Sequence, residues 1–475
     1  MMSPYFQNQS CDPFTPLSQA CELGNYASYS INVTCVYDAV AGVHFTRENN
    51  IRLVMKTTGH DYIGRSTGPG SLSLWMWHLK TADPIYDYQS SWYSGPAIKI
   101  GAGMTAAEVY AAVVAIGYRV VGGECPTVAI AGGYSQGGGH SMLSTAYGMA
   151  SDQVLEWEVI TADGEHLIAT PEKNTDLYWA LSGGGAGNYA VVLSMTARMY
   201  PDGPVGGASL RLANTNETAY WEAVSQWLQL SPGFVGTSNT LIFMILNSVF
   251  EAFAITLPDQ PSSNVYTLLA PYTSKLKELG IEYNLTTTDS DNYYDHFNTY
   301  LGPLPYGFSP PYTTLISRLI PKSVVSDAKA TDAVVDVVRQ IVSDGVFLVG
   351  CEVLDVQNTS HPDNAVQATW REAAIGCTMN SYWNFTAPLE SNLAVKQKMV
   401  DTHVPALEAV TPGGGVYMNE MDIWYQGDWK ANIYGDKYAR LLDIKHKWDP
   451  SHLFWGAFAV GSDEMALDSN GRLCN

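Results

Sequence analysis

A glycine-rich stretch that contains no cation constrains this chain more than any other feature. Residues 122–139, GGECPTVAIAGGYSQGGG, hold seven glycines, and SGGGAGN follows at 182–188. Glycines at this density can serve turns alone, but they also let backbone N–H groups approach a ligand and form anion-binding nests. Between Arg119 and Lys173 there is no Lys or Arg. A phosphate bound here must therefore be held by backbone amides and helix N-termini.

The stretch matches neither of two familiar nucleotide-binding motifs. A Walker loop needs Gly-Lys-Ser/Thr, which is absent here. GGGAGN at 183–188 does not open a helix in a βαβ unit with an acidic residue beyond it, as a dinucleotide fingerprint does. The pattern favours a pyrophosphate-containing ligand that is bound in another way.

A second distinctive run is TTGHDY at 57–62, which places a histidine in a loop of small residues. It follows an expected strand in which Ile51, Leu53 and Met55 alternate with other residues. His60 in such a loop fits a metal ligand, a solvent-facing residue or a contact to a bound group, and the run alone leaves these open. No His/Cys cluster in the chain has the spacing of a metal site.

The pattern of elements predicts an α+β protein. Helices, strands and glycine loops fill residues 1–204, including a capping box at Thr105 and Glu108 and a hairpin at Asp163-Gly164. The run PDGP at 201–204 marks a boundary. Residues 205–425 predict a substrate domain with an antiparallel sheet covered on one face by helices, and 426–475 form a C-terminal segment rich in aromatics.

Charge and composition exclude some partners. The formal net charge is −21, which disfavours nucleic acid and anionic membranes, and no run of 18 apolar residues predicts a membrane span. Six Asn-x-Ser/Thr sites and seven cysteines favour a secreted, extracellular protein that carries N-glycans. No signal peptide is visible at the start, and we interpret it as removed or replaced. The six sites are Asn8, Asn32, Asn216, Asn284, Asn358 and Asn384.

Seven cysteines leave one unpaired. Six of them could form three disulfides, in any of fifteen connectivities. Cys125 stands alone inside the glycine stretch, although another cysteine could be the odd one. The other six are Cys11, Cys21, Cys35, Cys351, Cys377 and Cys474.

Four segments together resemble the berberine-bridge-enzyme-like branch of the vanillyl-alcohol-oxidase flavoprotein family, nearest to its secreted fungal, isoamyl-alcohol-oxidase-like members. They are KTTGHDYIGRS (56–66), residues 122–164, SGGGAGNYAVV (182–192) and YGDKYARLLDIKHKWDPSHLFW (434–455). The resemblance is strong over the first 200 residues and the tail, and loose across 205–410. It implies a two-lobed, PCMH-type FAD-binding domain and a substrate domain whose sheet lies over the flavin.

The resemblance also implies bicovalent FAD. His60 matches the histidine linked to the flavin 8α-methyl and Cys125 the cysteine linked to C6, which would explain the odd cysteine. Val128 matches an oxygen-gate position at which valine accompanies oxidases, and this implies reoxidation by O2 with H2O2 as product. The further residues that match cofactor-contacting segments are Thr57, Thr58, Gly59, Asp61, Tyr62, Gly132, Gly133, Gly138, Gly139, Ser141 and Tyr434.

Hydride transfer from an alcohol needs a base for the hydroxyl proton. The run GVYMNEMDIWYQGDW at 415–429 resembles the family's last substrate-domain strand, in which Glu420 matches the position of a Glu or Gln. Strand alternation would place Glu420 and Asp422 on one face, so Glu420 is the predicted base and Asp422 the alternative. Tyr147 matches a tyrosine that contacts the substrate oxygen. His140, after three glycines, could contact the cofactor or a catalytic group, or be structural.

Three functions remain open from the sequence. The first is a secreted FAD-dependent oxidase of primary or secondary alcohols, polyols or sugar hydroxyls. The second is a flavoenzyme of secondary metabolism that performs oxidative cyclisation or dehydrogenation. The third is a non-enzymatic, carbohydrate-binding glycoprotein that uses its aromatics as stacking platforms.

Overall fold

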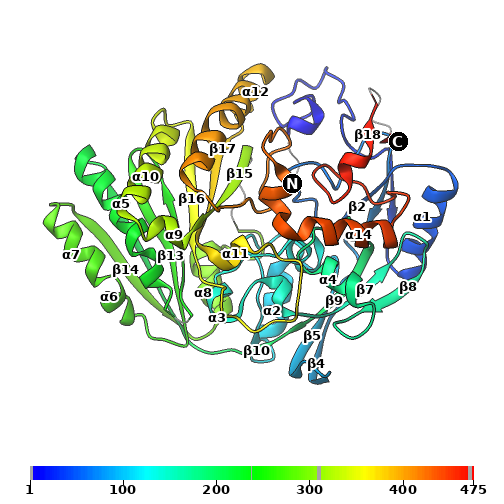
Figure 1. Ribbon diagram of the computed structural model, residues 1–475, viewed down its shortest axis with the longest axis horizontal. Helices are drawn as coiled ribbons and strands as arrows, with labels where there is room; N and C mark the ends of the chain where they lie inside the picture. Colours follow the sequence, from blue (N-terminus) through cyan, green and yellow to red (C-terminus); the bar gives the residue numbers. More distant parts are fainter. Residues whose placement is uncertain (1–3, 237, 308–311, 469–472, 475) are drawn as a thin grey trace.

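The computed structural model describes residues 4–236, 238–307, 312–468 and 473–474, and it has an α+β architecture (Figure 1). Two larger sheets lie in the first 200 residues, beside the short antiparallel pair of β6 and β10. One is a parallel three-stranded sheet in the order β1-β3-β2. The other is an antiparallel five-stranded sheet in the order β4-β5-β9-β7-β8. Their strands are β1 (Tyr29–Asn32), β2 (Leu53–Lys56), β3 (Leu72–Trp75), β4 (Ala82–Gln89), β5 (Ser94–Gly101), β7 (Val154–Ile160), β8 (His166–Ala169) and β9 (Val191–Arg198).

Local signals in this part of the sequence form the elements that they predict. Helix α2 (Ala106–Val114) begins at Thr105, whose hydroxyl accepts from the Glu108 amide while the Glu108 carboxylate accepts from the Thr105 amide. This is the predicted capping box. Strands β7 and β8 pair around Asp163-Gly164, as the hairpin signal predicts. The other elements of this part are α1 (Val36–Glu48), β6 (Tyr118–Arg119), α3 (Ser144–Tyr147), α4 (Thr175–Leu181) and β10 (Tyr200–Pro201).

A seven-stranded antiparallel sheet dominates the rest of the chain, as predicted. Its order is β14-β11-β13-β12-β16-β17-β15. The strands are β11 (Val205–Ala213), β12 (Thr240–Ile245), β13 (Val249–Pro258), β14 (Tyr283–Ser290), β15 (Tyr312–Pro321), β16 (Phe347–Val353) and β17 (Ala373–Tyr382).

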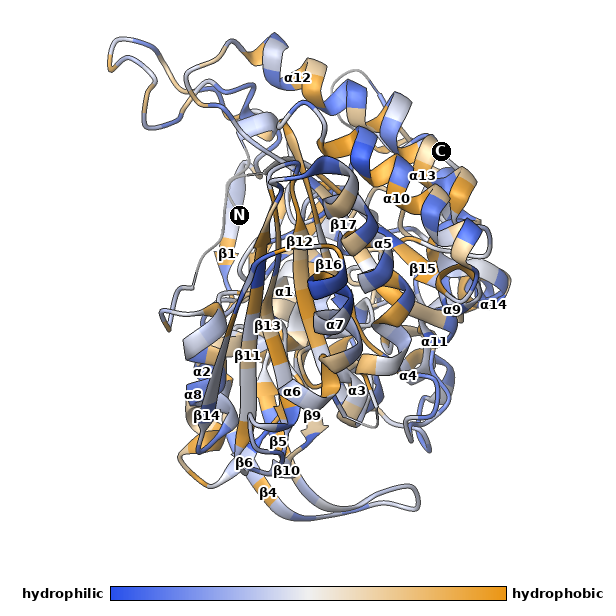
Figure 2. Cartoon of the chain, turned by 90° about the vertical axis from the view of Figure 1, so that its left-hand side faces the viewer, coloured by the Kyte–Doolittle hydropathy of each residue, from blue (hydrophilic) through white to orange (hydrophobic). Residues whose placement is uncertain are grey.

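Helices cover the outer face of this sheet. Helix α10 (Ala328–Val342) packs against α5 (Glu217–Phe234), α13 (Val404–Val410) and β16. Figure 2 shows these helices side by side along the sheet, with hydrophobic and hydrophilic residues alternating along each. The buried side of α10 includes Val334, Val338 and Ile341, at the spacing of one helical face. The other helices of this part are α6 (Asn264–Leu268), α7 (Ala270–Glu278), α8 (Tyr293–Leu301), α9 (Lys322–Val325), α11 (Thr369–Glu372) and α12 (Leu389–Lys398).

The chain then returns to its first half. Helix α14 (Tyr438–Trp448) packs on α4, and the orange and red tail lies beside the blue N-terminal elements in Figure 1. Among the described residues, no helix is both long and apolar enough to cross a membrane. The sheets divide the chain near residue 204, but the exact domain limits of 204 and 425 stay a prediction.

The predicted strand at 415–429 is wrong. Gly415 makes one bridge to Leu319, and turns follow through Trp424. The Asp422 carboxylate accepts from the Trp424 amide at 2.8 Å, and the Glu420 amide donates to the Tyr417 carbonyl at 2.9 Å. Local hydrogen bonds thus replace a strand ladder, so the alternation argument for Glu420 and Asp422 fails.

Two disulfides are formed. Cys11 pairs with Cys21, and Cys351 pairs with Cys377 across β16 and β17. Cys125 is an unbridged, partly exposed thiol, as its predicted role requires, and Cys35 and Cys474 lie outside the two bridges. The described residues thus form two of the three bridges that six cysteines allow.

Candidate active site

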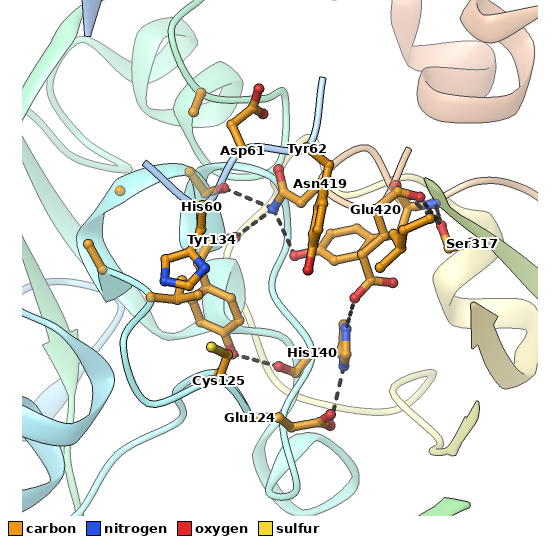
Figure 3. Close-up of a pocket in the computed structure, with 18 of the residues that line it drawn as sticks. His60, Asp61, Tyr62, Glu124, Cys125, Tyr134, His140, Ser317, Asn419 and Glu420 are labelled. Carbon is orange, nitrogen blue, oxygen red and sulfur yellow. Dashed lines mark hydrogen bonds and ion pairs between the residues drawn. The ribbon is translucent and has the colours of Figure 1, made fainter. Parts of the chain in front are cut away.

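A cavity of about 660 Å³ lies between the glycine-rich first half and the seven-stranded sheet (Figure 3). One wall comes from the end of β2, the loop 57–66 and residues 123–136. The opposite wall comes from alternate residues of neighbouring strands: Leu315, Ser317 and Leu319 on β15, Leu348, Gly350 and Glu352 on β16, and Gly376, Thr378, Asn380 and Tyr382 on β17. The disulfide-bonded Cys351 and Cys377 also line the cavity. Apart from this pair, the period of two indicates that the sheet turns one face to the cavity and the other to the helices.

His60 and Cys125 meet on the first wall, where both contact the Thr127 hydroxyl. His60 Nε2 lies 2.9 Å from Thr127 Oγ1, and Cys125 Sγ lies 3.5 Å from the same oxygen. Both side chains line the cavity. Burial lowers the pKa of His60 to about 4, so its imidazole is neutral at ordinary pH. A neutral imidazole and a thiol are both nucleophiles.

Glycine backbone forms part of the cavity wall, for example at Gly132, Gly133 and Gly187. The Gln136 carbonyl accepts from the amides of Gly183 and Gly185 at 3.0 and 2.9 Å, which joins the two glycine segments. Gly132 approaches the loop so closely that an added Cβ would lie 2.9 Å from Thr57 Oγ1. Among the described lining residues Arg65 is the one Lys or Arg, and Asp61 pairs with it at 2.7 Å.

These features fit FAD. The cavity has the volume of a typical cofactor site and is lined by glycine backbone that lets N–H groups approach a pyrophosphate. Two nucleophilic side chains stand together on one wall, where they could hold the flavin ring. When bound, FAD supplies the acceptor for a hydride and passes the electrons on.

His140 forms a largely buried cluster with three carboxylates, to which both walls of the cavity contribute. Its Nδ1 lies 2.7 Å from Glu352 Oε2 and 3.5 Å from Glu124 Oε1, and its Nε2 lies 3.1 Å from Glu420 Oε1. Figure 3 shows Glu420 and Glu124 at opposite ends of the imidazole. The Trp370 ring stacks over the imidazole and Tyr417 meets it edge-on.

Asn419 holds the segment 415–429, which carries Glu420, in place. Its side-chain amide donates to the Gly133 carbonyl at 2.9 Å and to the Tyr417 hydroxyl at 2.8 Å. The Ser317 amide donates to the Glu420 carbonyl at 2.8 Å. Glu420 therefore faces the cavity although its segment is not a strand, because contacts to both walls hold its backbone.

The predicted site residues divide into two groups. Eleven of them line the cavity: Thr57, Thr58, Gly59, His60, Asp61, Tyr62, Cys125, Val128, Gly132, Gly133 and Glu420. Six lie outside it: Gly138, Gly139, Ser141, Tyr147, Asp422 and Tyr434.

The six outside residues have other partners. Tyr147 accepts from the Arg119 guanidinium at 2.7 Å, and Asp422 is buried in an ion pair with Lys396. The Tyr434 hydroxyl donates to the Phe458 carbonyl at 2.9 Å, and the Ser141 amide donates to Ser144 Oγ at 2.8 Å.

Gly138 and Gly139 have positive φ angles of 114° and 76°, and their carbonyls accept from the amides of Ser151 and Ala150. They shape the turn before His140.

Sequence reasoning did not find Glu124, Glu352, Arg65 or Tyr417. Glu352 lies among apolar residues on β16, and its carboxylate can be recognised as part of a site only once its partners are known. Glu124 directly precedes Cys125, and Arg65 follows the TTGHDY loop. Their closeness in sequence to predicted site residues was the signal that could have identified them.

Comparison with known proteins agrees with this fold. Residues 27–170 match the FAD binding domain family, and residues 416–460 match the berberine and berberine like family. The chain is 49% identical to the bifunctional decalin synthase calF of Penicillium decumbens and 46% identical to the VAO-type flavoprotein oxidase VAO615 of Thermothelomyces thermophilus. Each match covers 100% of this chain and 83% of the relative.

Solved structures show the same fold. The VAO-type flavoprotein MtVAO615 from Myceliophthora thermophila C1 superposes with a TM-score of 0.96 at 46% identity, over 100% of this chain and 86% of that chain. Glucooligosaccharide oxidase from Acremonium strictum superposes with a TM-score of 0.76 at 17% identity, over 93% of each chain. Fold and site define an FAD-dependent oxidoreductase with a PCMH-type FAD-binding domain. The chain belongs to the berberine-bridge-enzyme-like branch of the vanillyl-alcohol-oxidase family, and this excludes a purely carbohydrate-binding role.

Proposed function

We propose that this enzyme is an oxidase that binds FAD covalently through both His60 and Cys125 and oxidises an alcohol, with Glu420 accepting the hydroxyl proton and O2 giving H2O2. One observation carries the proposal: the two nucleophiles meet at Thr127 on one wall, and Glu420 faces the same cavity from the other. Glucooligosaccharide oxidase from Acremonium strictum holds a 6-S-cysteinyl, 8α-N1-histidyl FAD, which uses the same pair of residue types.

Flavin retention tests the tethers. After denaturation in acid and SDS, the wild-type chain should stay yellow, and each of His60→Ala and Cys125→Ser should keep one link. Only the double variant should release all of its flavin. Flavin that leaves the denatured wild-type chain would overturn the double attachment.

Turnover tests the base. Glu420→Gln should stay yellow and lose peroxide formation with every alcohol that the wild type oxidises, because an amide cannot accept the proton. The exposed carboxylate variant Glu165→Gln is the matched control and should keep full activity. Full activity in Glu420→Gln would contradict the assignment.

Val128, which lines the cavity, supports O2 as the acceptor, and Val128→Leu should slow reoxidation by O2.

An oxidative cyclisation or dehydrogenation in secondary metabolism is the second candidate. It is favoured by the 49% identity to a decalin synthase and by an apolar group on the cavity wall formed by Ile242, Met244, Phe253 and Leu348. A peroxide-coupled screen of simple alcohols, oligosaccharides and polyketide-like compounds separates the candidates. Turnover of sugars alone would speak against the second.

Secretion and N-glycosylation complete the proposal. All six asparagines in Asn-x-Ser/Thr sites are exposed: Asn8, Asn32, Asn216, Asn284, Asn358 and Asn384. A buried site could not accept a glycan, so the exposure supports glycosylation. Treatment of the protein from its native host with an N-glycosidase should lower its mass, and an unchanged mass would count against this.

A further inference from the structure

The environment of His140 is unusual for a histidine. The imidazole is 17% exposed, and carboxylates from three separate parts of the chain face its two nitrogens. Glu352 comes from β16, Glu124 from the glycine stretch and Glu420 from the segment 415–429. Their side chains are 5%, 22% and 23% exposed, so water does little to screen the charges.

The other groups around His140 are neutral. Burial raises the pKa of the Tyr417 phenol to about 12, and it raises that of the Tyr134 phenol well above its usual value. The Tyr134 hydroxyl donates to the His140 carbonyl at 2.7 Å. The three carboxylates are therefore the charged groups that determine whether the His140 imidazole is protonated.

These charges favour a protonated imidazole. Burial alone would lower the pKa of His140, but Glu352, Glu420 and Glu124 outweigh it and hold that pKa well above its usual value. Burial, together with the neighbouring Glu124, raises the pKa of Glu352 to about 8.

We propose that the Glu124–Glu352 pair keeps His140 as an imidazolium, and that this cation holds the Glu420 side chain oriented toward the cavity. The inference rests on the proposed role of Glu420 as the base. His140 is a positioning residue, because it acts through Glu420 Oε1. When the substrate O–H bond breaks, its proton forms an O–H bond on Glu420, and the charge of the cluster rises by one.

The distances favour this arrangement over a metal ion. Glu124, His140 and Glu352 could in principle supply three metal ligands. However, His140 Nδ1 and Glu352 Oε2 are 2.7 Å apart, the distance of a close ion pair. Two ligands bound at about 2.0–2.1 Å around a tetrahedral zinc would lie roughly 3.4 Å apart.

The charge of His140 can be measured without turnover. In holoenzyme with isotope-labelled histidines, the NMR signal that disappears in His140→Gln reports on this ring. We expect it to keep the imidazolium chemical shift up to at least pH 8, which is well above the ordinary histidine pKa of about 6.5. In Glu352→Gln its midpoint should fall by about one pH unit or more. A wild-type ring that is neutral at pH 6.5 would overturn the proposal.

The split between kcat and KM tests the effect on Glu420. His140→Gln should lower kcat about tenfold and leave KM near its wild-type value, because Glu420 is still present but is no longer held in position. Glu165→Gln should leave both constants unchanged. A wild-type kcat in His140→Gln, or a rise in KM with kcat unchanged, would overturn the proposal.

Two further results separate the possible failures. If Glu420→Gln keeps its turnover, the proposed function fails, while the NMR titration still decides the charge of His140. Elemental analysis of the holoenzyme should find no stoichiometric metal. One ion per chain, removed by chelator with loss of the imidazolium signal, would make the cluster a metal site and overturn the proposal. If His140→Gln does not fold, Glu124→Gln and Glu352→Gln supply the same comparison, each with a lowered His140 midpoint.

Discussion

At the scale of single residues, Thr127 organises the proposed attachment site because its hydroxyl contacts both His60 and Cys125. Thr127→Val keeps the shape and removes the hydrogen bond that orients the imidazole. We expect the fraction of chains linked through His60 to fall several-fold. Peptide mass spectrometry of the His60 peptide measures this, and Thr127→Ser is the control that keeps the hydroxyl. Equal linkage in all three proteins would show that Thr127 does not orient His60.

Asp422 illustrates how one residue can look catalytic and be structural. Its carboxylate is 2% exposed and accepts from Lys396, Thr314 and the Trp424 amide. Asp422→Asn leaves a buried, unpaired ammonium, which costs about 3–5 kcal/mol. The melting temperature should therefore fall clearly, while the kcat of the folded, flavin-loaded fraction stays near wild type. A normal melting temperature together with a lost kcat would indicate that Asp422 takes part in catalysis.

At the scale of elements, Glu158 connects four strands of the five-stranded sheet. From β7 it binds Lys99 on β5 at 2.8 Å, Ser194 on β9 at 2.6 Å and His166 on β8 at 2.9 Å. Burial opposes the charge of Glu158, but these partners outweigh it and lower its pKa from 4.5 to about 2.

This network predicts a pH-dependent stability. Because the folded pKa of Glu158 is lowered, its stabilisation is present above pH 4.5 and is lost as the pH falls toward 2. Glu158→Gln should cost roughly 1–2 kcal/mol of unfolding free energy near pH 6. Urea unfolding at pH 6 and at pH 3 should show the difference from wild type shrinking at the lower pH. A difference that grows as the pH falls would contradict the assigned network.

Elements with local signals could be predicted from sequence, and contacts between distant segments could not. The hairpin at Asp163-Gly164 and the capping box at Thr105 depend on residues within a few positions of each other. The segment around Glu420 was misread as a strand, since side-chain bonds from Asp422 and Asn419 override its alternation. Glu352 could not be assigned a role, because its partners come from residues 124 and 140, and only the fold brings them together.

At the scale of the whole molecule, the site exists only where three parts of the chain meet. The first half supplies His60 and Cys125, the large sheet supplies Glu352, and the segment 415–429 supplies Glu420. The chain then returns to the first half, where α14 packs on α4. Lys445 on α14 holds the C-terminal segment against the first half. Its ammonium donates to the carbonyls of Asn188 and Phe454 at 2.7 Å and pairs with Asp449. The family resemblance predicted His60, Cys125 and Glu420 at the cavity, but not how the parts are held together.

A cofactor that contacts both walls should therefore stabilise the docking of the two halves. The double variant His60→Ala/Cys125→Ser allows FAD to bind reversibly, and a ligand that binds only the folded state stabilises it by RT ln(1 + [L]/Kd). At a free FAD concentration a hundred times Kd this is about 2.7 kcal/mol, which corresponds to a rise of a few degrees in melting temperature. Calorimetry of the flavin-free double variant should show a low transition that rises with added FAD, while the wild type, already loaded, should not respond. A flavin-free protein that melts at the wild-type temperature, with no effect of FAD, would mean that protein contacts alone dock the two halves and that the cavity is formed without help from its cofactor.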